Sequence, residues 1–89
     1  MKIVFSGNAW QQYQHWVAND RATLKRLNAL IDECRRTPFA GTGKPEPLRG
    51  ELRGWWSRRI DDEDRLVYRV TGTAPDQAIE IAACRYHYK

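Results

Sequence analysis

The spacing of apolar residues changes partway along this chain, and the change limits the folds that it can adopt. Before residue 38, apolar side chains recur every three to four residues, as on one face of a helix. From Glu51 onward they alternate with polar residues, which is typical of strands. Residues 39–50 separate the two halves, and their three Gly and two Pro favour a long loop. The sequence therefore predicts an α+β fold.

Capping residues and a proline mark the ends of two predicted helices. A short apolar strand over residues 2–5 precedes Ser6, which can cap the first helix. Asp20 can cap the second helix in the same way. Pro38 would end that helix, because the residue before a proline is disfavoured in the helical conformation.

The second half of the chain is predicted to form three strands, near residues 52–60, 64–71 and 78–86. Short turns at residues 61–63 and 71–76 would join them, so neighbouring strands should pair antiparallel. Both helices are expected to cover one face of this twisted sheet. The other face, where arginines alternate with apolar residues, is expected to remain open.

The length and the cysteine content bound the class of protein. With 89 residues, the chain has room for one domain, spanning residues 1–89, around a single core. Cys34 and Cys84 form no CxxC pair and are expected to be buried thiols. No apolar run approaches the roughly 20 residues that cross a bilayer, and the first residues lack a signal-peptide pattern. We therefore expect a cytoplasmic protein with no membrane partner.

The basic residues point to an anionic partner. The net charge is +4, and eleven of the fifteen basic residues are Arg. Arginine presents a planar fork of donors that fits a phosphate two bonds at a time. This composition favours a nucleic acid, or an acidic protein that mimics one, as the partner.

Two segments carry candidate acid–base groups. The sequence given ends in Arg85-Tyr86-His87-Tyr88-Lys89, which places an imidazole between two tyrosines directly after a predicted strand. Because imidazole titrates near neutrality, His87 could transfer a proton to an anion. Glu46 lies between two prolines in the loop, so it is either a rigidly presented base or an exposed loop carboxylate.

Arginines and tryptophans in the predicted strands have alternative interpretations. Side chains alternate between faces, so Arg58 and Arg59 should point opposite ways and Arg65 and Arg69 should share a face. Each arginine alone reads as a solvated residue paired with the acids of residues 61–64, but as a group they could hold a phosphate. Trp10, Trp16 and one of the adjacent residues Trp55 and Trp56 are expected in the core. The other of these two adjacent tryptophans could stack on a base, contact a partner protein or lie buried at the sheet edge.

Metal chemistry has weak support in the sequence. The acids of residues 61–64 could be a magnesium site, although a run of acids in a tight turn is usually solvated. His15 and His87 are distant in sequence and no cysteine pair accompanies them, so zinc has no ligand set. His15 is expected at the surface of the first helix.

Five motifs occur in order along the chain. They are Arg35-Arg36-Thr37-Pro38-Phe39, Gly43-Lys44-Pro45-Glu46-Pro47-Leu48, Trp56-Ser57-Arg58-Arg59-Ile60, Arg65-Leu66-Val67-Tyr68, and Ala82-Ala83-Cys84-Arg85-Tyr86-His87-Tyr88. Together they resemble the YoeB-type toxins of bacterial toxin–antitoxin systems, in the RelE superfamily of RNA-cleaving toxins. The resemblance covers nearly the whole chain and implies a RelE-like fold.

The resemblance also implies an activity and a set of site residues. A toxin of this type cuts mRNA in the ribosomal A site without a metal or other cofactor, and a paired, YefM-like antitoxin silences it. Glu46 matches the general base and His87 the general acid. Arg65 matches the arginine that stabilises the phosphate, and Tyr88 matches the tyrosine that completes the site. The residues expected around the RNA are Lys44, Arg49 and Arg59, and Arg85 is expected as a further phosphate contact. Relatives also form dimers, so a homodimer is expected.

Two other functions remain open from the sequence. The protein could be a non-catalytic module that uses the same basic face to bind RNA, the ribosome or an antitoxin. It could also be a magnesium nuclease that uses the acids of residues 61–64.

Overall fold

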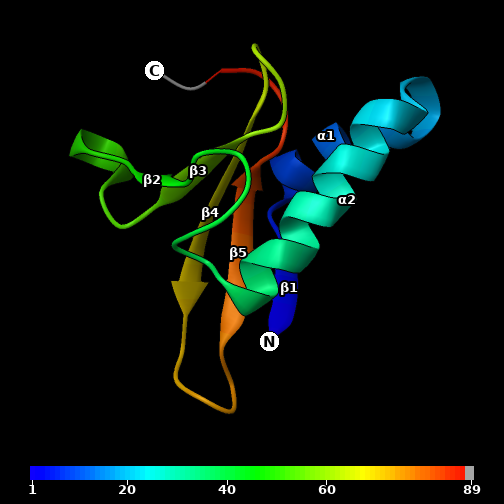
Figure 1. Ribbon diagram of the computed structural model, residues 1–89. Helices are drawn as coiled ribbons and strands as arrows, with labels where there is room; N and C mark the ends of the chain where they lie inside the picture. Colours follow the sequence, from blue (N-terminus) through cyan, green and yellow to red (C-terminus); the bar gives the residue numbers. More distant parts are fainter. Residues whose placement is uncertain (88–89) are drawn as a thin grey trace.

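Two helices pack against one face of a five-stranded sheet (Figure 1). The computed structural model describes residues 1–87. The strands are β1 (Lys2–Phe5), β2 (Glu46–Pro47), β3 (Trp56–Arg59), β4 (Arg65–Thr71) and β5 (Ala78–Ala83). Their order across the sheet is β1-β5-β4-β3-β2, with β1 parallel to β5 and every other neighbour antiparallel. The predicted α+β, mainly antiparallel fold with a short N-terminal strand is confirmed.

The predicted capping residues begin both helices. The Ser6 hydroxyl accepts a hydrogen bond from the amide of Ala9 at the start of α1 (Gly7–Asn19). The Asp20 carboxylate does the same for the amide of Thr23 at the start of α2 (Arg21–Arg36). Bonds from the Thr23 amide and hydroxyl lower the pKa of Asp20, despite partial desolvation. The second helix ends just before Pro38, as predicted.

The core lies between the helices and the sheet. Buried side chains from both helices meet those of β4 and β5; they include Trp16, Leu27, Leu30, Leu66, Tyr68, Ile79 and Ile81. The prediction for Trp10 is wrong, because 49% of that residue is exposed. Its ring stacks on Tyr13 and meets the edge of Phe5, and both of these rings are themselves only partly buried.

The paired tryptophans lie on opposite faces of the sheet. Trp56 packs against the core and contacts Phe39, with 4.8 Å between the ring centroids. Trp55 lies under the guanidinium of Arg69, which is 4.4 Å from its ring centroid. Trp55 is therefore the outward member of the pair, and a cation already covers it.

Both cysteines are free and fully buried, as predicted. Burial raises the pKa of the Cys34 thiol to about 11 and that of Cys84 to about 12. Cys34 belongs to α2, and Cys84 follows β5. The two thiols therefore lie in parts of the core that come from distant stretches of the chain.

The sheet differs from the sequence prediction in three places. The strand predicted over 52–60 begins only at Trp56, because Gly50–Leu52 form a 3₁₀ helix and Gly54 turns the chain with φ of 95°. The loop predicted over 39–50 contains the short strand β2. The strand predicted over 78–86 ends at Ala83. No helix among residues 1–87 has the length and apolar character that crossing a bilayer requires.

Candidate RNA-cleavage site

The register of β2 places Glu46 on the sheet face opposite the helices. Glu46 pairs with Ser57, and Pro47 pairs with Trp56. Trp56 faces the core, so Ser57 and Glu46 face the other way. An edge strand tolerates Pro47, which cannot donate a backbone hydrogen bond. The loop prolines thus accompany a strand that fixes the direction of the Glu46 side chain.

Two arginines share this face. Arg59 lies opposite Arg65 in the β3–β4 pair, two residues beyond Ser57. Adjacent strands are about 4.8 Å apart, so Glu46, Arg59 and Arg65 stand on three consecutive strands within reach of one substrate. Arg59 is exposed, whereas Arg65 is only 7% exposed. We define these three residues as the anionic–cationic row.

This face is not as open as the sequence suggested. Ser57 and Val67, which lie between the longer side chains of the face, are almost completely buried. Arg69, predicted on the same face as Arg65, is engaged by Glu80 at 2.7 Å. The exposed charged residues of this face are therefore Glu46, Arg59 and Arg69, and Arg69 already pairs with Glu80.

The guanidinium of Arg65 is fixed by the turn that precedes it. Its Nη1 donates to the carbonyl of Asp61 at 2.7 Å and to that of Asp64 at 3.1 Å. No bond from Nε or Nη2 occurs within residues 1–87. The side chain is thus oriented by two backbone carbonyls, and donors remain for a phosphate.

The segment after β5 is held on both sides. On the helix side, the Trp16 indole donates to the carbonyl of Cys84 at 2.8 Å, and the amide of Cys84 donates to Gln12 at 2.7 Å. On the sheet side, the amide of Arg65 donates to the carbonyl of Tyr86 at 3.0 Å. His87 follows directly and is exposed. The chain therefore delivers His87 to the end of β4 where Arg65 lies.

The remaining predicted residues are more widely distributed. Lys44 is exposed and follows Gly43, whose carbonyl accepts a bond from the amide of Arg59 at 2.7 Å. Arg49 is exposed at the start of the 3₁₀ helix. Arg85 lies over the rings of Trp16 and Tyr86 beside α1, so the structure does not bring it into the anionic–cationic row. Tyr88 and Lys89 lie outside the described residues.

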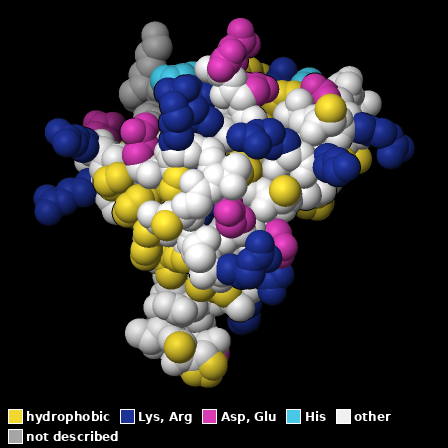
Figure 2. All heavy atoms as spheres, viewed as in Figure 1, with side chains coloured by type: hydrophobic (Ala, Val, Ile, Leu, Met, Phe, Trp, Pro, Cys, Tyr) yellow, Lys and Arg dark blue, Asp and Glu magenta, His cyan; other side chains and the backbone are white. Residues whose placement is uncertain are grey.

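Basic side chains are spread over the surface near the end of the chain (Figure 2). Arg58 is absent from this surface because it is fully buried. The interpretation of Arg58 as a solvated partner of residues 61–64 is therefore wrong.

Arg58 instead joins α2 to the loop that follows it. Its guanidinium binds Glu33 at 2.7 Å and the Tyr68 hydroxyl at 3.1 Å. It also donates to three carbonyls of the loop, those of Thr37, Ala40 and Thr42. Sequence alternation correctly predicted that Arg58 and Arg59 point opposite ways. It gave no signal for which of the two would be buried.

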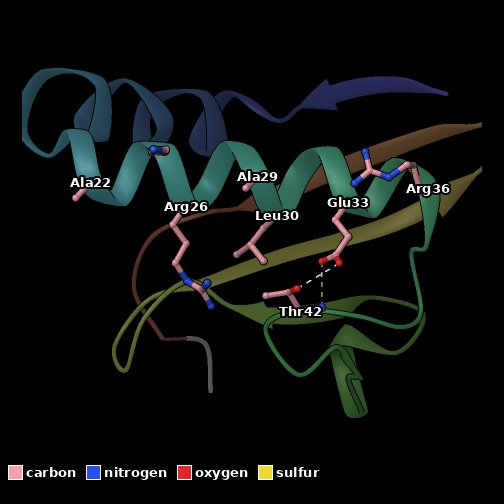
Figure 3. A pocket seen from close by; sticks show the side chains of 8 residues that line it. Ala22, Arg26, Ala29, Leu30, Glu33, Arg36 and Thr42 are labelled. Atoms are coloured by element: carbon pink, nitrogen blue, oxygen red, sulfur yellow. Dashed lines mark hydrogen bonds between the residues drawn. The ribbon is translucent and has the colours of Figure 1, made fainter.

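A hollow of about 490 Å³ lies between α2 and this loop, away from Glu46 and Arg65 (Figure 3). Glu33 within it accepts bonds from the amide and hydroxyl of Thr42. Arg26 donates to the carbonyls of Arg59 and Ile60, and Arg36 pairs with Asp32. These charged groups already bind other groups of the protein. We therefore interpret the hollow as part of the contact that holds the loop against α2.

The acids of the β3–β4 turn bind backbone amides. Asp61 Oδ1 accepts bonds from the amides of Glu63 and Asp64. Asp64 Oδ1 accepts a bond from the amide of Tyr86 at 2.7 Å. Burial raises the pKa of Asp64, and Asp61 and Glu63 add to that effect. Among residues 1–87, no group of three or more His, Cys, Asp or Glu side chains is arranged to hold a metal ion.

Comparison with known proteins identifies the class and the family. The fold is that of RelE-like toxins. Escherichia coli YafQ has the same fold, with a TM-score of 0.70 at 20% identity. Residues 5–88 match the YoeB-like toxin of bacterial type II toxin–antitoxin systems. The chain belongs to this YoeB family of type II toxins.

Individual relatives agree over their full lengths. Toxin YoeB of *Escherichia coli* K12 is 52% identical over 88 residues, which cover 99% of this chain and 100% of the relative. The YoeB/ParE toxin from *Agrobacterium tumefaciens* has a TM-score of 0.95 at 48% identity, covering 99% of this chain and 100% of that one. A *Staphylococcus aureus* YoeB–YefM complex contains a chain with a TM-score of 0.87 at 42% identity, covering 99% and 98%.

Proposed function

We propose that this toxin is an endoribonuclease that cleaves mRNA in the ribosomal A site. The observation that carries the proposal is the anionic–cationic row, in which the β2 register puts Glu46 on the same sheet face as Arg59 and Arg65. The fixed segment after β5 supports it, because it brings His87 to the end of β4 that holds Arg65. A base, an acid and fixed positive charge are then available to one phosphate.

These groups suit RNA because RNA carries its own nucleophile. Glu46 would take the proton of the 2′-hydroxyl, and the 2′-oxygen would attack the adjacent phosphorus. His87 would protonate the leaving 5′-oxygen as its bond to phosphorus breaks. Acid–base assistance of this kind accelerates a reaction by roughly 10² to 10⁴. The products would be a 2′,3′-cyclic phosphate and a 5′-hydroxyl end.

Positive charge on the sheet face would stabilise the phosphorane between these steps. Arg65 is held by the turn carbonyls before substrate arrives, so its charge needs little reorganisation. Arg59, Lys44 and Arg49 are exposed and would bind the flanking RNA backbone. Tyr88 would complete the site. The mechanism uses no metal, and DNA should resist cleavage because it lacks the 2′-hydroxyl.

The same face would bind a YefM-like antitoxin in the cytoplasm. A *Staphylococcus aureus* relative forms a heterotetrameric complex with YefM. The net charge of +4 suits an acidic, partly disordered antitoxin segment that folds on binding. A homodimer is also proposed, since another *Staphylococcus aureus* relative is a YoeB dimer.

Primer extension on a translated message tests the activity. New 5′ ends should appear with the wild-type protein, and they should disappear in Glu46→Gln and His87→Gln. His15→Gln is the matched histidine control and Glu51→Gln the matched carboxylate control, and both should cleave normally. Cleavage by His87→Gln at the wild-type rate would contradict the assigned roles.

The same assay distinguishes an endoribonuclease from a non-catalytic inhibitor of translation. Arg65 is almost buried, so less of its guanidinium is presented than an open cationic site would offer. If the protein only occupies the ribosome, translation should stop without new 5′ ends, and His87→Gln should inhibit as strongly as wild type. Loss of cleavage in Asp62→Ala would instead indicate a magnesium nuclease that uses the acids of residues 61–64.

A further inference from the structure

The backbone of Tyr86 is gripped by two consecutive residues of β4 and its preceding turn. Its amide donates to Asp64 Oδ1 at 2.7 Å, and its carbonyl accepts from the amide of Arg65 at 3.0 Å. The second bond joins backbone groups and is available to any residue type except proline at position 65. The first needs an acceptor side chain at position 64.

Tyr86 adopts a conformation that a tyrosine alone would avoid. Its φ is 68°, in the left-handed region that bulky residues rarely occupy. Such a conformation persists only when its surroundings over-determine it. Here the surroundings are the two bonds to Asp64 and Arg65, and the guanidinium of Arg85, 4.5 Å from the centroid of the Tyr86 ring. The bend at Tyr86 sets the direction in which His87 leaves the sheet.

Asp64 is itself held in place. Its amide donates to Asp61 Oδ1 at 2.7 Å, and its carbonyl accepts from Arg65 Nη1 at 3.1 Å. Asp64 therefore contacts both the guanidinium of Arg65, through its backbone, and the segment that carries His87, through its carboxylate. One residue couples the geometry of the two groups.

We propose that Asp64 is a positioning residue for RNA cleavage. Its carboxylate fastens the bend at Tyr86, and so aligns His87 with the phosphate that Arg65 holds. Asp64 contacts neither RNA nor the reacting atoms. The inference rests on the proposed function, because it assigns Asp64 a part in presenting the general acid.

Three substitutions in one turn test this role. Asp64→Ala removes the acceptor, Asp64→Asn keeps an oxygen that can accept the same bond, and Asp62→Ala changes a neighbouring exposed acid. Cleavage of mRNA on purified ribosome complexes should fall roughly ten- to a hundredfold in kcat for Asp64→Ala, because small misalignments of a catalytic group are costly. KM for the ribosome complex should stay within about twofold, since binding groups are untouched. Asp64→Asn should restore most of kcat, and Asp62→Ala should match wild type.

Hydrogen exchange gives a readout that needs no activity. The amide of Tyr86 should be protected in wild type, Asp64→Asn and Asp62→Ala, and should exchange faster in Asp64→Ala. If Asp64→Ala does not fold, Asp64→Glu displaces the carboxylate by one methylene and should show partial loss of both kcat and protection.

The outcomes distinguish this inference from the proposed function. One outcome would overturn the positioning role alone: His87→Gln is inactive, but Asp64→Ala cleaves at the wild-type kcat. If Asp64→Ala does not fold, the same reasoning applies to Asp64→Glu. In either case the proposed function stands. If His87→Gln cleaves normally, the proposed function fails. Equal lowering of kcat by Asp64→Ala and Asp64→Asn would also overturn the role, because the acceptor oxygen would then be irrelevant.

Discussion

At the scale of single residues, the arginines of β3 show how burial divides neighbours. Arg58 is fully buried and bonded to Glu33, Tyr68 and three loop carbonyls, whereas Arg59 is exposed on the opposite face. Removing one member of a buried ion pair leaves the other charge and several carbonyls without a partner. Arg58 thus contributes to stability through the groups it satisfies.

Arg58→Met should therefore lower the free energy of unfolding by about 3–5 kcal/mol. Urea denaturation followed by tryptophan fluorescence measures this loss. The matched control is Arg69→Met, which breaks the partly exposed pair with Glu80 and should cost at most about 1 kcal/mol. Equal losses in the two variants would show that the buried network adds nothing.

The carboxylate of Glu33 should make stability depend on acid pH. Burial opposes its ionisation, but bonds from Thr42 and the charge of Arg58 outweigh burial and hold the pKa of Glu33 below its usual 4.5. A lowered pKa in the folded state gives stability that is fully present above pH 4.5 and is lost as the pH falls through the folded-state pKa.

Glu33→Gln cannot titrate, so its unfolding free energy should change less on acidification than that of the wild type. Urea denaturation at about pH 7 and about pH 3 would measure the difference. Asp20, whose pKa is also lowered, is present in both proteins and contributes equally to both. Parallel losses in the two proteins would exclude a role for Glu33 in the pH dependence.

At the scale of elements, the loop before β2 approaches β3 through a glycine. Gly43 has φ of 85°, and a Cβ there would lie 3.0 Å from the carbonyl oxygen of Arg59 and 3.2 Å from the Arg58 Cβ. Gly50 also has a positive φ, of 67°, but a Cβ there would meet nothing within 4 Å. Substitutions at the two glycines therefore distinguish the stability cost of backbone strain from the stability cost of a close contact.

Gly50→Ala should cost about 1–2 kcal/mol from the left-handed conformation alone. Gly43→Ala should cost more, because the loop must also move away from β3, and that shift would carry Lys44 and Glu46 with it. Thermal unfolding of both variants measures the difference. If Gly43→Ala is no less stable than Gly50→Ala, the contact between loop and strand is looser than described.

Elements with local causes could be predicted from the sequence, and those with tertiary causes could not. Ser6, Asp20 and Pro38 mark the helix ends through neighbours three residues away or fewer, so both helices were predicted closely. β2 exists only because β3 lies beside it. β5 ends at Ala83 because the backbone of Cys84 binds Gln12 and Trp16, 72 and 68 residues earlier in the chain.

The candidate site divides in the same way. The motifs around Glu46, Arg65 and His87 were recognised by family resemblance, and strand register then placed two of the three on one face. The bond from Tyr86 to Asp64 depends on a bend that no local pattern specifies. Sequence analysis therefore offered two interpretations of Asp64, a solvated acid or a magnesium ligand, and neither is this contact.

At the scale of the whole molecule, the two buried thiols report on how cooperatively the domain opens. Cys34 and Cys84 are fully buried, and burial raises their pKa values to about 11 and about 12. Because the thiolate is the reactive form, both should resist a disulfide reagent at about pH 8 until the protein unfolds. The urea-unfolded protein should react at both positions.

Labelling of single-cysteine variants, Cys34→Ala and Cys84→Ala, measures each thiol separately. Both labelling rates should rise together across the unfolding transition, since α2 and the segment after β5 share one core. Rapid labelling of Cys84 in native buffer, with Cys34 still protected, would show that the segment carrying His87 detaches independently.

The order of the strands also governs when the domain can fold during synthesis. β5 lies between β1 and β4, and it is the last strand to be made among those described. Lys2 faces Ala78, so the first strand cannot pair with its neighbour until residue 78 and the strand that follows it have been synthesised. A nascent toxin of the proposed function would thus acquire activity only after all five strands had been made.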